Sequence, residues 1–538
     1  MLHLNIRGLQ DHSGWQAAQI ALPRYDVAAM QQRTLVHPKW LHFGAGNIFY
    51  AFLAAAQQTL LNTGAADSGI VAVASHNFRA AEDKFKPHDG LSLLVRMHAD
   101  GTSDKEVIGS VAGCLKADWQ DGDWHRLQKM FQDPALQMVS FTITEKGYAL
   151  RDMNGQLLPV VQADLSAGPD RPRHTLSIVV SLLHSRFLAG GTPVALVSMD
   201  NCAQNGKKLR DSCLAIAAAW AEHGFVSDAF LRWISDEKTV SFPWTMIDKI
   251  TPYPSEKVAR ELTDCGVADM TISTSATGSI SAPFVNAEVT EYLVAEDAFP
   301  NGRPPLEQAG VYFTDRLTVE RSEKMKVGTC LNPLHTALAI FGCLLGYRTI
   351  AAEMQDPELT ALVRGIAAES LPVVEDPGII RPEAFIQQVL TERFPNPAIP
   401  DTPQRIATDS SQKIPVRYGG TLQRYKTRGL PMAELRYIPL VFAGWCRYLL
   451  AVDDAGRPME LSPDPLLAQL RPLLADITWN DPSSLGDRLK TILAKDSIFG
   501  VNLYEVGLGQ PVEDAFRSML EGPGAVRNTL KRLMREKN

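Results

Sequence analysis

The chain is poor in cysteine, with seven among 538 residues, and no two of them form a CxxC pair. An odd, unpatterned set is typical of reduced thiols in a cytosolic protein. A strong charge of either sign is missing too, since the net charge is −7 and the pI is near 6.0. This balance gives no reason to expect a nucleic-acid or membrane-surface partner.

Long apolar runs and a targeting segment are also missing. The most apolar stretches, around residues 334–345 and 438–445, are shorter than a membrane span. Residues 1–30 lack the basic, apolar and small-residue order of a signal peptide. We therefore expect a cytoplasmic, soluble protein, either a monomer or a small homo-oligomer.

The chain does have the length and patterning of a multidomain globular protein. Its 538 residues, 45% apolar and 21% charged, suggest two or three domains. Residues 37–64 have the pattern of a strand, a glycine turn and a helix, and further strands are expected at 69–74, 91–97, 138–144 and 192–198. From about residue 330 the periodicity predicts helices over 334–354, 359–371, 383–393, 431–452, 464–475 and 512–535.

This order predicts an α/β fold with two parts. Strands separated by helices indicate a Rossmann-like, doubly wound dinucleotide-binding domain, which we place at residues 1–290. A mainly α-helical catalytic and substrate-binding domain is expected over residues 291–538. Functional groups should then follow the carboxyl ends of the strands.

A glycine turn is the first chemical motif. Gly44, Ala45 and Gly46 follow a strand and open a helix, where backbone N–H groups and the helix dipole could hold a pyrophosphate. The third fingerprint position is Phe49, and a purely structural turn is the alternative. No ribose-binding acid follows the second strand, and Arg79 could accept a 2′-phosphate there or be a surface arginine. The missing acid removes the main support for NAD over NADP. NAD is the expected cofactor, with NADP as the alternative.

A lysine, an asparagine and a histidine stand close together before a long apolar stretch. Asn332 followed by Pro333 is typical of an N-cap with proline at the first helical position. His335 would then lie one turn in, and Lys326 just before the helix. These groups could handle a proton and a polarised oxygen without a metal. The alternative is a capped core helix with a solvated lysine and a buried histidine.

Several ordered motifs resemble the polyol-specific long-chain dehydrogenases, which include mannitol 2-dehydrogenases and the mannonate (fructuronate) and tagaturonate oxidoreductases. The resemblance covers roughly residues 37–450. Its motifs are the turn Gly44 to Asn47, the TITE-x-GY stretch 142–148, Asp200 and Asn201 with Asn205 and Gly206, the signature 241–252 with IDKITP at its centre, Arg393 and Phe394 with Asn396 and Pro397, and the segment Asp401 to Lys413.

The resemblance implies metal-independent hydride transfer between nicotinamide C4 and a secondary carbinol, with Lys326 as the base. It implies that Glu323 relays the proton to solvent and that Asn201 and Asn332 donate hydrogen bonds to the developing alkoxide. His335 would bind the substrate oxygen. The implied cofactor residues are Phe43, Gly44, Ala45, Gly46, Asn47 and Ile48, and the implied substrate-binding residues are Asp248, Arg405 and Lys413. The alternatives are surface salt bridges for Arg405 and Lys413, a core histidine for His335, a surface acid for Glu323 and a plain strand-end turn residue for Asn201.

The chain also departs from the family pattern. Five residues separate Lys326 from Asn332, where the family usually has four, so Val327 occupies the expected register. A one-residue bulge, which we place at Gly328, would absorb the difference. In the signature, Trp244 replaces a common asparagine and Lys249 replaces an arginine. In the glycine turn, Tyr50 stands where arginine is frequent.

These observations predict an NAD(P)-dependent oxidoreductase that interconverts a sugar alcohol or aldonate with its ketose or ketouronate. A hexuronate-type pair such as fructuronate and mannonate is slightly favoured by the chain length and by the N-terminal segment LNIRGLQDHSGWQAAQIALPRYD. A carboxylate substrate would want an arginine that makes two hydrogen bonds, and Arg405 is available. A mannitol 2-dehydrogenase type of enzyme is the alternative within the family. A catalytically silent dinucleotide-binding module is the alternative of another class.

Overall fold

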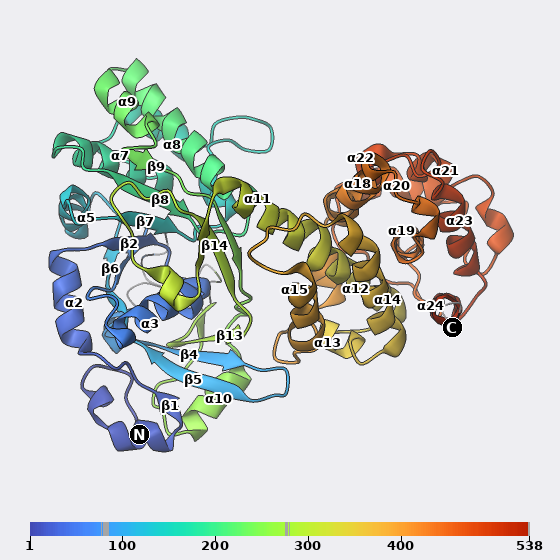
Figure 1. Ribbon diagram of the computed structural model, residues 1–538, viewed down its shortest axis with the longest axis horizontal. Coiled ribbons are helices and arrows are strands. Elements are labelled where there is room, and N and C mark those ends of the chain that lie inside the picture. Colours follow the sequence, from blue (N-terminus) through green and yellow to red (C-terminus); the bar gives the residue numbers. More distant parts are fainter. Residues whose placement is uncertain (77, 79–84, 275–277, 279, 536–538) are drawn as a thin grey trace. The chain divides into compact units, whose positions relative to one another are not determined.

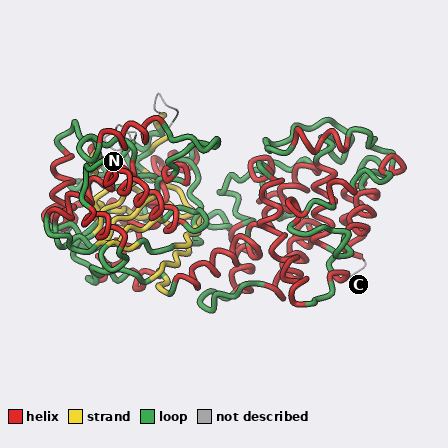
Figure 2. The backbone as a smooth tube through the Cα atoms, turned by 90° about the horizontal axis from the view of Figure 1, so that it is seen from above, coloured by secondary structure: helices red, strands yellow, loops and turns green. Residues whose placement is uncertain are grey.

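The computed structural model describes residues 1–76, 78, 85–274, 278 and 280–535, which form two compact units. The first unit comprises Met1–Met97 and Thr102–Glu320, and the second comprises His98–Gly101 and Arg321–Asn538. The described strands all belong to the first unit, whereas the second is built from helices (Figure 1, Figure 2). The predicted boundary at residue 290 lies between two strands of the first unit.

A six-stranded parallel sheet forms the centre of the first unit. Its order is β6-β3-β2-β7-β8-β9, and each neighbouring pair is parallel. Counted along the chain, this is the 3-2-1-4-5-6 order of a doubly wound dinucleotide-binding fold, as predicted. The strands are β2 (Trp40–Phe43), β3 (Ile70–Ala74), β6 (Val111–Lys116), β7 (Met138–Phe141), β8 (Val194–Ser198) and β9 (Val240–Ser241).

Both faces of this sheet are buried, because successive side chains point to opposite sides. Leu41 and Phe43 of β2 pack into one core cluster with α5 (Asp123–Gln132), α7 (Thr175–Leu188) and α8 (Asn205–Glu222). Trp40 packs into the other with α3 (Ala55–Thr63). The remaining helices that lie wholly in this unit are α1 (His12–Ala17), α2 (Val27–Val36), α6 (Pro159–Ala167), α9 (Asp228–Ser235) and α10 (Glu256–Asp264).

The strand predicted at 91–97 belongs to a different sheet. It is β4 (Ser92–Met97), which pairs antiparallel with β5 (Ser103–Ile108) and parallel with β13 (Phe284–Glu288). The parallel sheet takes β6 as its third strand instead. Other short strands are β1 (Ile20–Ala21) beside β5, the set β10 (Thr245–Asp248), β14 (Tyr292–Glu296) and β15 (Tyr312–Thr314), and the pair β11 (Ser273–Thr274) and β12 (Ile280–Ser281).

The second unit follows the predicted helical pattern with more interruptions. Gly346, at φ +78°, ends the first long helix, and residues 522–524 (Gly-Pro-Gly) split the predicted helix 512–535. The helices are α11 (Arg316–Met325, which begins in the first unit), α12 (Asn332–Leu345), α13 (Ile350–Glu353), α14 (Pro357–Ser370), α15 (Pro382–Gln388), α16 (Pro403–Ala407), α17 (Ser410–Ile414), α18 (Gly420–Arg428), α19 (Tyr437–Tyr448), α20 (Leu467–Leu470), α21 (Lys490–Leu493), α22 (Asp496–Phe499), α23 (Gly509–Ser518) and α24 (Ala525–Arg535).

Four wider, π-helical segments occur among the described residues: Phe49–Ala54, Lys326–Cys330, Val389–Arg393 and Pro415–Gly419. Such segments add one residue to a helical turn and are frequent at functional sites.

The helical stretch Arg316–Leu345 is long and apolar enough to cross a membrane by length and composition alone, and the mean hydropathy of its most apolar window is 1.4. The apolar run around 334–345, which was expected to be too short, therefore belongs to a longer helical stretch. Because 78% of its most apolar window is buried inside the protein, the stretch has the character of a core helix.

Candidate functional site

The glycine turn lies at the switch point of the sheet, between β2 and β7. Gly44 has a φ of +120°, and a Cβ atom on it would lie 2.7 Å from both the carbonyl and the side-chain oxygen of Thr142. At Gly46 no atom of the described residues lies within 4 Å of such a Cβ, which leaves room for a bound phosphate near its backbone. Helical structure begins at Asn47, which places a helix N-terminus at the turn.

The remaining predicted cofactor residues differ in exposure. Ala45, Asn47 and Ile48 are half-buried at the turn. Phe43 is fully buried and stacks on Phe141 at 5.3 Å between ring centroids, so only its backbone can face a ligand. Arg79 lies outside the described residues.

A buried histidine, which the sequence analysis did not single out, lies next to this turn. His42 of β2 lies 2.7 Å from the Ser140 hydroxyl and 2.8 Å from the Thr142 hydroxyl, and it stacks on Phe49 at 4.4 Å. Burial lowers the pKa of His42 to about 3, so the imidazole is neutral. The sequence signal that could have identified His42 was the occurrence of polar residues at alternate positions of the otherwise apolar strands β2 and β7.

Two of the predicted motifs interlock at the ends of β7 and β8. Asp200 accepts hydrogen bonds from the backbone N–H groups of Ile143 (2.9 Å) and Thr144 (3.0 Å), and from the Tyr148 hydroxyl (2.6 Å). Thr144 has a φ of +64°, which is strained for a β-branched residue. Asp200 therefore holds a strained turn, and burial raises its pKa. Asn201, the next residue, is exposed at the carboxyl end of β8.

Asn205 and Gly206 connect the end of β8 to β10, the strand within the signature 241–252. The Asn205 amide donates to the Thr245 hydroxyl (2.8 Å) and accepts from the Thr245 N–H (3.0 Å). A Cβ on Gly206 would lie 2.7 Å from the Phe242 carbonyl oxygen, so glycine permits this close approach.

The predicted substrate residue Asp248 ends β10 and is 4% exposed. Its neighbour Lys249 stands where the family signature has arginine, and it pairs with Glu291 at 2.8 Å. Burial lowers the pKa of Lys249, against the opposing effect of Glu291. The Ile250 N–H donates to Glu288 over 2.6 Å, which fixes the end of the signature strand.

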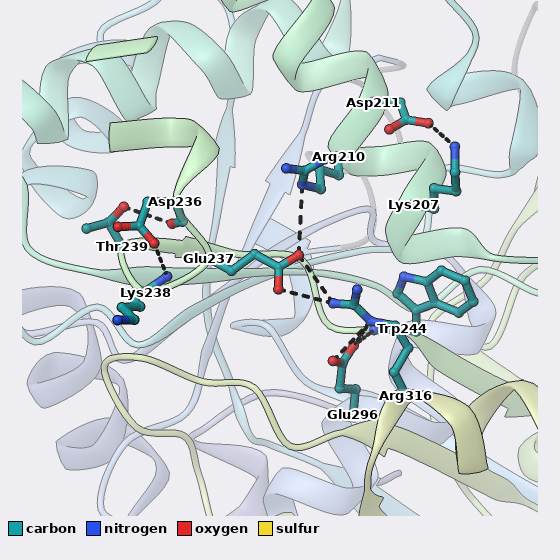
Figure 3. Close-up of polar contacts among 10 residues, drawn as sticks. All are labelled: Lys207, Arg210, Asp211, Asp236, Glu237, Lys238, Thr239, Trp244, Glu296 and Arg316. Carbon is teal, nitrogen blue, oxygen red and sulfur yellow. Dashed lines mark hydrogen bonds and ion pairs between the residues drawn. The ribbon is translucent and has the colours of Figure 1, made fainter. Parts of the chain in front are cut away.

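An ion-pair cluster holds the first residue of α11 to the first unit (Figure 3). The Arg316 Nε lies 3.1 and 3.0 Å from the two Glu296 carboxylate oxygens, and its Nη2 lies 3.4 Å from Glu237, which Arg210 approaches at 4.0 Å. Trp244, the unusual residue of the signature, donates its backbone N–H to Glu296 (3.1 Å) and lies 5.6 Å from the Arg316 guanidinium. The substitution thus adds a cation–π contact at the start of α11.

The predicted base Lys326 lies in the second unit, in the π-helix Lys326–Cys330 that follows α11. Lys326 precedes α12 as expected, but it is part of a helical turn and is 2% exposed, so the alternative of a solvated lysine is wrong. The Leu331 N–H donates to the Lys326 carbonyl five residues earlier (3.1 Å), which is the π-helical pattern. The predicted one-residue bulge is therefore present. Gly328 lies within it, and its carbonyl accepts from Thr421 (3.3 Å).

The N-cap expected at Asn332 is also wrong. The cap position is Leu331, no side chain caps the helix, and Asn332 is the first residue of α12. The extra residue of the π-helix moves the cap, so the Asn332 side chain is not engaged as a cap. Its carbonyl oxygen accepts from the Thr336 hydroxyl at 2.9 Å.

His335 lies one turn into α12 as expected. Its ring packs on Phe394 at 5.0 Å, and its Nε2 lies 3.4 Å from an Asp401 oxygen without forming a hydrogen bond. Burial lowers the pKa of His335 well below its usual value, and the charges of Arg417, Arg405, Arg393 and Lys413 lower it further. A neutral imidazole with an unpaired, buried nitrogen can bind a substrate hydroxyl.

The predicted substrate cations lie near this histidine but differ in their contacts. Arg405 is ion-paired with Asp401, and its side chain is 64% exposed. Lys413 donates to the Ile406 carbonyl (3.2 Å), and burial lowers its pKa. Glu323 is half-buried on α11. Within the second unit, the structure thus brings Asn332, His335 and the cations together around the start of α12.

Metal ligation has no visible basis in the described part of the chain, where no cluster of three His, Cys, Asp or Glu side chains is placed to hold an ion. The chemistry available there is that of amine, amide, imidazole and guanidinium groups. These can transfer a proton, donate to an oxyanion and bind a polyhydroxylated or carboxylated chain.

Comparison with known proteins identifies the family of the chain. The Mannitol dehydrogenase Rossmann domain matches residues 38–308, and the Mannitol dehydrogenase C-terminal domain matches residues 318–520. The chain is 48% identical to the D-mannonate oxidoreductase of Thermotoga maritima over 536 residues, 99% of each chain. It is 31% identical to the mannitol 2-dehydrogenase of Neosartorya fischeri over 512 residues, 93% of each chain. The structure of Pseudomonas fluorescens mannitol 2-dehydrogenase in ternary complex with NAD and D-mannitol matches with a TM-score of 0.70 at 30% identity, covering 99% of this chain and 100% of that one.

Proposed function

Because the chain belongs to the mannitol dehydrogenase family of oxidoreductases, as its motifs predicted, we propose that it interconverts D-mannonate and D-fructuronate with NAD as the cofactor. The observation that carries this proposal is the 48% identity, over 99% of each chain, with a D-mannonate oxidoreductase. The cations around His335 support it, since a hexonate carries a carboxylate that a neutral polyol lacks.

In the proposed reaction, hydride passes between nicotinamide C4 and the carbinol carbon of the substrate. Lys326 accepts the hydroxyl proton during oxidation and returns it during ketone reduction, and Glu323 relays it to solvent. Removal of an amine from water favours its uncharged form, which is the form that accepts a proton; Lys326 is 2% exposed. Asn201, Asn332 and His335 bind the developing alkoxide or its hydroxyl.

The proposed cofactor site is the turn Phe43 to Ile48. The left-handed Gly44 and the unobstructed Gly46 support it, because both let a pyrophosphate approach the backbone at a helix N-terminus. Arg405, Lys413 and Asp248 are proposed to bind the distal groups of the substrate. NADP remains the alternative cofactor. We further propose a soluble, cytoplasmic enzyme that is a monomer or a small homo-oligomer.

A spectrophotometric assay of nicotinamide reduction tests the proposal. The purified chain is given D-mannonate, D-mannitol and related polyols and aldonates with NAD⁺ and with NADP⁺. We expect D-mannonate with NAD⁺ to give the highest kcat/KM. Cofactor binding without turnover of any substrate would refute the enzyme assignment and favour a silent binding module.

A mannitol 2-dehydrogenase is the second candidate. The observation that favours it is the match, at 30% identity, with the structure of such an enzyme bound to NAD and D-mannitol. A higher kcat/KM for D-mannitol than for D-mannonate would establish this alternative.

A further inference from the structure

Arg417 lies beside the start of α12 and was not among the predicted site residues. It belongs to the π-helix Pro415–Gly419. Its Nη1 donates to the Thr336 hydroxyl and lies 3.5 Å from the Asn332 carbonyl oxygen. Thr336 itself donates to Asn332, so the three residues form one hydrogen-bonded group around the first turn of α12.

The rest of this guanidinium has no protein partner in the part of the chain that the structure describes. Nη1 makes the hydrogen bonds of Arg417, and no described carboxylate lies within ion-pair distance of it. A guanidinium has five N–H donors in a planar fork, so Nε and Nη2 are left for another acceptor. Arg417 is half-buried, and burial lowers its pKa to about 10.

Arg405, the residue expected to bind a carboxylate, differs in both respects. Its guanidinium is engaged by Asp401, and its side chain is 64% exposed. An arginine already paired with an acid has its charge partly neutralised, so it attracts a second carboxylate less strongly. The contacts of Arg417 are to neutral oxygens, which orient the fork without neutralising it.

The position of Arg417 also links it to the other site residues. Of the charges that lower the pKa of His335, that of Arg417 has the largest effect, after burial itself. The three π-helices described in the second unit carry Lys326, Arg393 and Arg417, one each. Since such segments concentrate at functional sites, their coincidence with these cations supports a functional position for Arg417.

We propose that Arg417 is the specificity-determining residue that binds the substrate carboxylate through its free N–H donors and so selects a hexonate over a neutral polyol. This inference rests on the proposed function, which supplies the carboxylate. It replaces Arg405 in that role and leaves Arg405 to the hydroxyl groups. Thr336 acts as a positioning residue that fixes the plane of the guanidinium.

The test compares two substrates in one variant. Arg417→Gln removes the charge, and the ratio of kcat/KM for D-mannonate to kcat/KM for D-mannitol is measured with NAD⁺ against wild type. We expect this ratio to fall about 10- to 100-fold, the range for a charge-assisted hydrogen-bonded pair. A purely structural role would lower both constants together and leave the ratio unchanged. Arg428→Gln is the matched control, because Arg428 is exposed and, among the described residues, donates only to the Pro372 carbonyl (2.9 Å).

Two further variants keep the test decisive if Arg417→Gln folds poorly. Arg417→Lys keeps the charge without the fork, and Thr336→Val keeps the fork without its orienting hydroxyl; both should lower the ratio by less than Arg417→Gln. An unchanged ratio in folded variants of an enzyme that oxidises mannonate overturns the inference alone. A wild-type protein inactive on every hexonate overturns the proposed function and the inference together.

Discussion

Glu353 is a buried carboxyl group that should make the stability of the protein fall as pH rises. It ends α13 with no exposed surface, and neither carboxyl oxygen has a hydrogen-bond partner among the described residues. It packs so closely on α12 that a Cβ on Gly342 would lie 2.0 Å from its Oε1. Burial, followed by the charge of Asp356, raises the pKa of Glu353 to about 9, from an ordinary value of 4.5.

The sign of the effect follows from these two values. Below pH 4.5 both the folded and the unfolded chain hold the proton, and the contribution of Glu353 to stability is fully present. Above that pH the unfolded chain releases the proton while the folded chain retains it, so stability is lost until the pH has risen through about 9. The loss is about 1.4 kcal/mol per pH unit, or about 3 kcal/mol between pH 6 and pH 8.

Glu353→Gln replaces the protonated acid with a neutral group of the same shape and should remove this pH dependence. We expect the free energy of unfolding of the variant to gain about 3 kcal/mol on wild type between pH 6 and pH 8. Guanidinium unfolding followed by circular dichroism measures it at each pH. The exposed Glu434→Gln variant is the control for the change in net charge. Parallel pH profiles for wild type and Glu353→Gln would refute the reasoning.

Three further predictions concern the proposed site. Lys326→Ala should lower kcat about 10²- to 10⁴-fold without changing the Kd for NAD, because a general base is lost. Alanine at the half-exposed Lys324 is the control and should change neither constant. Full activity of Lys326→Ala in steady-state kinetics would contradict the assignment. Gly44→Ala should weaken NADH binding roughly tenfold or more in a fluorescence titration, because the new methyl group would lie 2.7 Å from the carbonyl oxygen after β7; unchanged affinity would exclude this turn as the cofactor site. Tyr148→Phe removes a 2.6 Å hydrogen bond to Asp200 and should cost about 1–3 kcal/mol in denaturant unfolding, and an unchanged stability would show that Asp200 needs no hydroxyl donor.

The architecture of the first unit was largely predictable, because parallel strands alternate with helices and carry strong local patterns. The strand 91–97 shows the limit. It is as apolar as a central strand, yet it pairs with β5 and β13. Pairing between strands far apart in the chain depends on tertiary packing, which the local pattern of β4 does not contain. The edge strand β6 was missed, since its apolar positions are broken by Gly113 and Cys114.

The candidate residues that belong to sequence motifs could be predicted, whereas the contacts that depend on tertiary packing could not. The motif residues Asp200 and Tyr148 were found from their pattern, but their mutual hydrogen bond joins residues 52 positions apart. The N-cap expected at Asn332 failed because an extra helical residue moves the cap to Leu331. No sequence motif pointed to Arg417. Its proposed role depends on the lack of a carboxylate partner among the described residues, which is a property of the fold and not of the local sequence.

The π-helix Lys326–Cys330 also affects how residues are matched between relatives. In an ordinary α-helix one added residue would turn the following residues by about 100° about the axis, whereas a π-helical turn absorbs the added residue. An ungapped alignment through Lys326 and Asn332 would therefore pair Val327 with the base of relatives that have the shorter spacing. Placing the gap inside the π-helix keeps both residues in register. Deleting one residue of this segment should then return the helix to ordinary winding and give the shorter spacing of those relatives, with Lys326 and Asn332 still in register.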